Sequence, residues 1–127
     1  MPSINFKPRF AEPVKSGQKR QTIRPHGKRA WKVGDMAYFF TGLRGHGTAT
    51  RLGQARLLSV RQVLIDTEGR EVHLETPDGR GGSFLACLLP DRALAFAQAD
   101  GFATLDDFFR FFREQYGGGI SGYLLEW

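Results

Sequence analysis

A short stretch of the chain, residues 17–24, combines several cations with a hydroxyl group: Lys19, Arg20, Thr22 and Arg24. In an extended strand alternate side chains share a face, so Arg20, Thr22 and Arg24 lie on one face and Lys19 on the other. Lys19 can approach Thr22 only through a turn or bulge, which Gly17 makes easy because glycine adopts irregular backbone angles at low cost. The stretch is typical of an anion-binding surface or of the reactive edge of a pocket, and a solvated basic turn is the alternative that the spacing leaves open.

An amine near a hydroxyl group can activate that hydroxyl as a nucleophile. A lysine is protonated at neutral pH, but partial burial and the like charges of Arg20 and Arg24 would lower the pKa of Lys19. A neutral Lys19 could then accept the proton of Thr22, whose oxygen would attack an amide carbonyl. Arg24 stays charged and presents two parallel donors, which suits a phosphate or a developing oxyanion.

A second basic segment, residues 25–35, contains further candidates for binding: Lys28, Arg29, Trp31 and Lys32. An exposed indole among cations can stack on a nucleobase while the cations bind its phosphates. We therefore predict a nucleic-acid or phosphate-binding surface made by this segment together with Arg20 and Arg24. The alternative is that Trp31 covers one end of a β-barrel.

The charge of the chain is divided unevenly along its 127 residues. Residues 1–51 contain 11 Lys or Arg against 2 Asp or Glu, whereas residues 52–127 contain 7 against 11. A polyanion such as RNA or single-stranded nucleic acid would therefore bind the first half. With 41% hydrophobic residues and 11 Phe the chain can fill one core, so we predict a single domain, residues 1–127.

Several classes of protein are excluded by what the sequence lacks. No apolar run reaches the roughly 18 residues of a membrane span and none resembles a signal peptide, so we expect a soluble, cytoplasmic protein with no membrane partner. The single cysteine, Cys87, cannot form an internal disulfide, and its apolar surroundings predict a core position. The histidines His26, His46 and His73 lie in separate segments, so neither a metal site nor a cofactor is expected.

The periodicity predicts an α+β fold, in which five or six short strands form a small mixed β-barrel flanked by two or three helices. Thr104 and Asp107 mark the start of the clearest helix, whose apolar stripe predicts a core face: Leu105, Phe108, Phe109, Phe112 and Tyr116. A second helix is expected from Pro90 to Ala99, and a short one at residues 9–16. The expected strands are residues 4–6, 19–24, 36–41, 54–66, 70–76 and 120–127, with an apolar segment at residues 84–89.

In its order of residues the chain resembles the ASCH domain family over essentially its whole length. The family's motif G-x-K-x-x-T-x-R matches Gly17, Lys19, Thr22 and Arg24, and downstream features match Lys32, Gly34, Asp35 and the D-G-F sequence of residues 100–102. A capped helix and a closing strand follow, as in the family. The resemblance implies a fold similar to PUA domains and the binding of RNA, single-stranded nucleic acid or a nucleotide in a cleft between barrel and helices.

Some ASCH proteins are similar to a small bacterial amidohydrolase that removes the acetyl group from N4-acetylcytidine, a modified nucleoside. For that alternative function the resemblance implies Lys19, Thr22 and Asp100 as catalytic residues, with Asp100 in the place of a Glu and one methylene shorter. Asp100 would orient the lysine or return a proton to the leaving amine. A ribonuclease is a further activity suggested for the family.

The same residues have a purely structural alternative, in which Lys19 and Asp100 form an ion pair that fastens a strand to a helix. If the site is functional, Lys19→Ala and Asp100→Ala are expected to abolish ligand binding or turnover and to change stability by no more than about 1 to 2 kcal/mol. Loss of folding in both variants would support the structural alternative.

Overall fold

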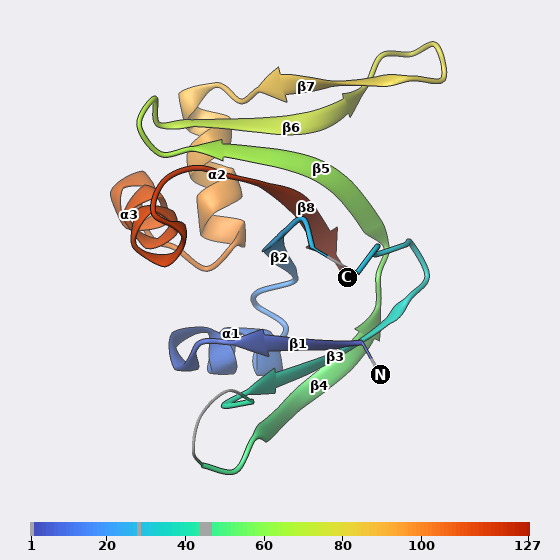
Figure 1. Ribbon diagram of the computed structural model, residues 1–127, viewed down its shortest axis with the longest axis vertical. Helices are drawn as coiled ribbons and strands as arrows, with labels where there is room; N and C mark the ends of the chain where they lie inside the picture. Colours follow the sequence, from blue (N-terminus) through green and yellow to red (C-terminus); the bar gives the residue numbers. More distant parts are fainter. Residues whose placement is uncertain (1, 28, 44–46) are drawn as a thin grey trace.

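The structure is a computed structural model that describes residues 2–27, 29–43 and 47–127. The strands form a three-stranded sheet in the order β1-β3-β4 and a five-stranded sheet in the order β2-β8-β5-β6-β7 (Figure 1). The strands are β1 Ser3–Phe6, β2 Gln21–Pro25, β3 Met36–Thr41, β4 Thr50–Arg56, β5 Ser59–Asp66, β6 Glu71–Pro77, β7 Ser83–Cys87 and β8 Ile120–Glu126. The helices are a 3₁₀ helix η1 Pro8–Phe10 and the α-helices α1 Ala11–Ser16, α2 Pro90–Ala99 and α3 Leu105–Tyr116.

In the five-stranded sheet β8 lies between β2 and β5, and α2 and α3 pack against the sheet. A strand presents every second side chain to the same face, so alternate residues of β5 and β6 are buried against the helices. The helices supply phenylalanine rings to the same core. This part of the core contains Val63, Ile65, Val72, Leu74, Phe96, Phe102, Phe108, Phe109, Phe112 and Leu124.

The three-stranded sheet is joined to the five-stranded sheet by the chain between β4 and β5 (Figure 1). In the smaller sheet β1 is parallel to β3, and β3 is antiparallel to β4. Leu57, between β4 and β5, is 1% exposed, and its N–H donates to the Asp35 carbonyl at 2.9 Å. The ring of Trp127 packs against Phe39 and Phe6, with centroids 4.5 and 6.2 Å away. The two sheets therefore share one continuous core.

The turn that leads into β2 begins where α1 ends, at Gly17. The φ angle of Gly17 is 83°, a left-handed conformation that glycine adopts most easily. The N–H of Lys19 donates to the Pro13 carbonyl at 2.9 Å, so the chain folds back on α1 before it enters the sheet. Lys19 therefore precedes the strand rather than belonging to it, and β2 pairs with β8 from Gln21 onward.

The predicted α+β class is confirmed, together with most of the elements. At the start of α3, Thr104 Oγ1 accepts a hydrogen bond from the N–H of Asp107 at 3.1 Å, as the capping pattern predicts. The predicted number of strands is wrong, because the described residues contain eight: the expected strand at 54–66 is divided at Leu57, and residues 83–87 form another strand. No strand pair joins the two sheets within the described residues, so a closed barrel is not confirmed.

Two predicted core positions are wrong. Cys87 is exposed, because it ends β7, an edge strand whose Phe84 and Leu85 are also 53% and 48% exposed. Tyr116 ends α3 with 37% exposure, and its ring stacks on that of Phe112. Among the described helices, none combines the length and the apolar character that a membrane crossing requires.

Candidate functional site

A cavity of about 600 Å³ lies between β1, β2, the basic segment that follows β2 and the C-terminal half of α3, and we call it the central pocket. It is lined by six of the residues that the sequence analysis selects: Lys19, Thr22, Arg24, Arg29, Trp31 and Asp100. Lys19 and Asp100 are 81 positions apart in the sequence. The fold thus brings the two separate parts of the predicted site to one cavity.

Lys19 and Asp100 form a buried ion pair on the wall of the central pocket. Lys19 Nζ donates to Asp100 Oδ1 at 3.0 Å and also to the main-chain carbonyl of Asp100. The two side chains are only 3% and 4% exposed. Gln21 Nε2 donates to the same carboxylate oxygen at 3.5 Å, and Lys19 Nζ lies 4.8 Å from the ring centroid of Phe10. The ion pair expected from the structural alternative is therefore formed by residues that also line the pocket.

Asp100 is positioned by the end of α2 and by the glycine that follows it. Its N–H donates to the Phe96 carbonyl at 3.1 Å, which continues the helical pattern for one more residue. Gly101 has a φ angle of 100°, and a Cβ atom there would lie 3.1 Å from the ring of Phe10. Glycine makes this turn without strain, so that Phe102 enters the core two residues after Asp100. The D-G-F sequence therefore has a local structural reason.

Burial controls the protonation of the Lys19–Asp100 pair. Desolvation lowers the pKa of Lys19 and raises the pKa of Asp100, and the attraction between the two groups opposes both shifts without reversing them. The nearby charge of Arg24 lowers the pKa of Lys19 further. The shift of Lys19 favours its neutral amine, which is the form that can accept a proton, and the shift of Asp100 favours its neutral carboxyl group.

The pair is expected to make protein stability depend on pH in two opposite steps. The native pKa of Asp100 is raised above its usual value of 3.8. Its contribution to the stability of the protein is therefore present below pH 3.8 and is lost as the pH rises through the native pKa. The native pKa of Lys19 is lowered below its usual value of 10.5. Its contribution to stability is therefore present above pH 10.5 and is lost as the pH falls through the native pKa. Relative to the double variant Lys19→Met/Asp100→Leu, the wild type should therefore lose stability as the pH rises above 3.8 and regain it toward 10.5. Denaturant unfolding at a series of pH values measures this difference, and a difference that stays constant would contradict the expectation.

Thr22 lies in β2, is 5% exposed and lines the same pocket. Its position in the sheet is fixed opposite Leu125 of β8. In the described part of the chain the hydrogen bonds of Lys19 Nζ go to Asp100, and none joins this amine to Thr22. The amine, the hydroxyl and the carboxylate therefore line one cavity.

Arg24 and Arg29 place positive charge over aromatic rings in the central pocket. The guanidinium of Arg24 lies 5.1 Å from the centroid of Phe6 and donates to the Asn5 carbonyl at 3.0 Å. The guanidinium of Arg29 lies 5.0 Å from the ring centroid of Trp31, which is partly buried against the core. Asp100 is the one acidic residue among the described lining residues, and Lys19 pairs with it. The pocket is therefore positively charged.

Two described residues that were predicted to bind nucleic acid or phosphate, Arg20 and Lys32, do not line this pocket. Arg20 is exposed, and its Nε donates to the Trp127 carbonyl at 3.1 Å beside a second, smaller cavity. Because of the turn before β2, Lys19 lines the central pocket whereas Arg20 lines the second cavity. Lys32 is exposed and does not line the central pocket. Lys28 falls outside the residues that the structure describes.

The central pocket also contains residues that the sequence analysis does not select. Asn5 and Lys7 lie in and just after β1, and Gln115 and Tyr116 lie at the end of α3. No local pattern marks Lys7, which directly follows Phe6 of β1. Gln115 and Tyr116 reach the pocket only through the packing of α3, which no local pattern specifies.

This arrangement has three chemical capacities: it can bind an anion, contact a planar ring and activate a hydroxyl group. Arg24 and Arg29 serve the first, Trp31 the second, and Lys19 with Thr22 the third. Comparisons of the chain with protein-family models, with curated proteins and with solved structures found no match.

Proposed function

We propose that the central pocket binds a nucleotide, either free or as part of RNA or another single-stranded nucleic acid. The observation that supports this most strongly is that one cavity of about 600 Å³ combines cations, aromatic rings and buried polar groups. Pockets for small ligands and cofactors have volumes of roughly 300 to 1,000 Å³. A nucleotide uses all three kinds of group, since it carries a phosphate, a flat base and a polar base edge.

The cations of the pocket suit the phosphate of this ligand. The guanidinium groups of Arg24 and Arg29 present paired donors that match phosphate oxygens, and Lys7 adds a third positive charge. All of these residues belong to the basic first half of the chain, residues 1–51. Part of the positive charge of this half therefore lies on the walls of one pocket.

The base of the nucleotide would stack on Trp31, and its polar edge would meet the buried groups. Stacking of a base on an aromatic side chain contributes about 1 to 3 kcal/mol. The resemblance to the ASCH family supports the same site, because the matching residues Lys19, Thr22, Arg24 and Asp100 all line this pocket. A PUA-like arrangement of barrel and helices around the pocket is part of this proposal.

The salt dependence of binding tests the proposal. Affinity for labelled single-stranded RNA should fall steeply as salt rises, because phosphate contacts release counterions. Arg29→Glu is expected to weaken binding and to reduce the slope of log K against log salt by about one for the phosphate contact it removes. Arg80→Glu changes the net charge equally at an exposed turn between β6 and β7, so its slope should match the wild type. Absence of binding at low salt, or equal slopes for all three proteins, would contradict the proposal.

A second candidate function, hydrolysis of an N4-acylated cytidine, is favoured by the buried Lys19–Asp100 pair and Thr22, which line the same pocket. Neutral Lys19 would take the proton of Thr22 while Thr22 Oγ1 attacks the acetyl carbonyl carbon. The bond from that carbon to N4 would then break as N4 takes a proton from the Lys19–Asp100 pair, which releases cytidine. Water would hydrolyse the acetyl ester left on Thr22, and Arg24 would stabilise the oxyanion formed in both steps.

Incubation of the pure protein with N4-acetylcytidine and with labelled RNA distinguishes these functions. Release of cytidine and acetate would support the hydrolase, and retention of intact RNA would support binding alone. Shortened RNA would indicate a ribonuclease, for which the described lining of the pocket offers no histidine pair.

A further inference from the structure

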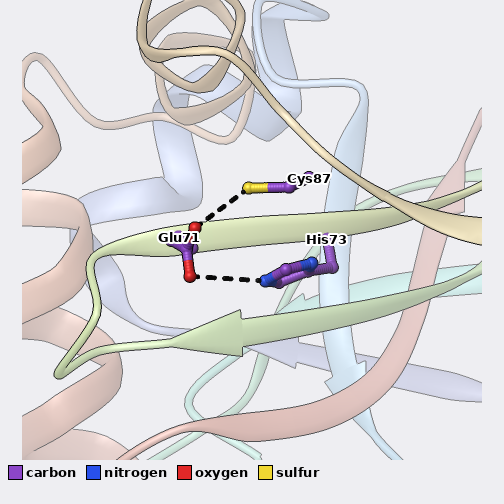
Figure 2. A group of neighbouring side chains, drawn as sticks. All are labelled: Glu71, His73 and Cys87. Atoms are coloured by element: carbon purple, nitrogen blue, oxygen red, sulfur yellow. Dashed lines mark hydrogen bonds and ion pairs between the residues drawn. The ribbon is translucent and has the colours of Figure 1, made fainter.

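Three side chains on β6 and β7 form a cluster that is separate from the central pocket, since none of them lines it. Glu71 and His73 are two residues apart on β6, so they lie on the same face of the sheet. Cys87 of β7 is the direct strand partner of His73. Figure 2 shows the three side chains pointing toward one another from the two strands.

The ligand atoms of these side chains all lie within 4.8 Å of one another. Cys87 Sγ donates to Glu71 Oε2 at 3.2 Å, and His73 Nε2 lies 3.8 Å from Glu71 Oε1 (Figure 2). In a tetrahedral zinc site the ligand atoms are roughly 3.3 to 3.8 Å apart, as bonds of about 2.0 to 2.3 Å require. The separations of 3.2 and 3.8 Å are close to this range.

We propose that Glu71, His73 and Cys87 bind one divalent transition-metal ion of the zinc class. Imidazole, thiolate and carboxylate are the ligand types that Zn²⁺ takes in proteins, whereas Mg²⁺ and Ca²⁺ take oxygen ligands. Cys87 binds as a thiolate, so the proton that it now donates to Glu71 is released to solvent when the metal enters. Three protein ligands leave the fourth position of the tetrahedron to water.

The sheet holds these ligands in place and suggests what the ion does. β6 pairs with β5 on one side and with β7 on the other, so His73 lies between Leu64 and Cys87. Glu71 and Cys87 are exposed, which gives an ion access from solvent. β7 is the edge strand and pairs with β6 alone among the described strands. An ion bound by both strands would therefore fasten the edge of the sheet.

Metal titration of the whole 127-residue chain, after treatment with a chelator, tests this site. With Zn²⁺ we expect one ion bound per chain and a rise in Tm, since a ligand that binds only the folded state stabilises it. With Co²⁺ as a spectroscopic probe we expect a thiolate-to-cobalt charge-transfer band. Cys87→Ser should remove that band, and Cys87→Ser, His73→Gln and Glu71→Gln should each weaken Zn²⁺ binding at least about 10-fold.

His26→Gln is the matched control for this experiment. His26 is an exposed histidine outside the cluster, and its Nε2 lies 2.7 Å from Gln62 Oε1. This variant should bind Zn²⁺ and Co²⁺ as the wild type does, and metal-free unfolding curves verify that all variants fold. Equal Zn²⁺ affinity in Cys87→Ser and the wild type, or no charge-transfer band with Co²⁺, would overturn the proposal.

Discussion

Lys19→Met is expected to lower the free energy of unfolding by about 3 to 5 kcal/mol, as the loss of one partner from a buried ion pair generally does. The substitution leaves the carboxylate of Asp100 at 4% exposure without the ammonium that now contacts it. This burial revises the expectation from sequence alone, which limited the change for Lys19→Ala and Asp100→Ala at a functional site to about 1 to 2 kcal/mol. Because burial raises the pKa of Asp100, the loss should become smaller at acid pH, where the carboxyl group takes up a proton.

The double variant Lys19→Met/Asp100→Leu is the control for this effect. It removes both charges, and apolar replacement of a buried pair is often neutral or stabilising, so most of the lost stability should return. Denaturant unfolding of the wild type, the two single variants and the double variant gives the coupling energy of the pair. A loss below about 1 kcal/mol in Lys19→Met would contradict the expectation. A stable double variant that no longer binds RNA or N4-acetylcytidine would separate the functional role of the pair from its structural role.

If the pocket hydrolyses N4-acetylcytidine as the second proposal states, Thr22→Val is expected to reduce that rate by roughly 10³-fold or more, as removal of a catalytic nucleophile does in other hydrolases. Valine is close to threonine in shape but has no oxygen to attack the carbonyl carbon. Binding of the nucleoside should persist, because the substitution leaves Arg24, Arg29 and Trp31 in the pocket. The rate of cytidine release measures the first effect, and calorimetric titration with cytidine measures the second.

Thr67→Val is the matched control for the loss of a buried hydroxyl group. Thr67 is 1% exposed, lies outside the central pocket, and its Oγ1 has no hydrogen-bond partner among the described residues. This variant should keep the kcat of the wild type. An unchanged kcat in Thr22→Val would show that Thr22 is not the nucleophile, and it would leave the nucleotide-binding proposal to be decided by the salt experiment.

Local sequence patterns predict where the helices and strands of this fold lie better than they predict how these elements pack together. The bounds of α2 and β3 are as predicted, because Pro90 begins the helix and a Gly34–Asp35 turn precedes the strand. The division between β4 and β5 is not predictable in this way. Leu57 interrupts the long strand where the two sheets meet, and its backbone partner Asp35 lies in a distant part of the sequence.

The candidate site shows the same limit at the level of single residues. Nothing in composition or periodicity says that Lys19 and Asp100 meet, and the family resemblance is the sequence signal that links them. The apolar run around Cys87 fits a central strand as well as an edge strand. The exposure of Cys87 therefore depends on the order of the strands in the sheet. The cluster of Cys87 with Glu71 and His73 cannot be predicted from the sequence for the same reason, since the pairing of β6 with β7 brings these residues together.

The pairing of β2 has a consequence for the order in which the protein acquires its site. β2 finds its strand partner in β8, about a hundred residues later, with Thr22 opposite Leu125. During synthesis from the N-terminus, the segment that carries Thr22 and Arg24 must wait for β8 to emerge before it can join a sheet. The smaller sheet, by contrast, is complete once Arg56 has been made. A nascent chain stalled before Ile120 should therefore lack a formed pocket.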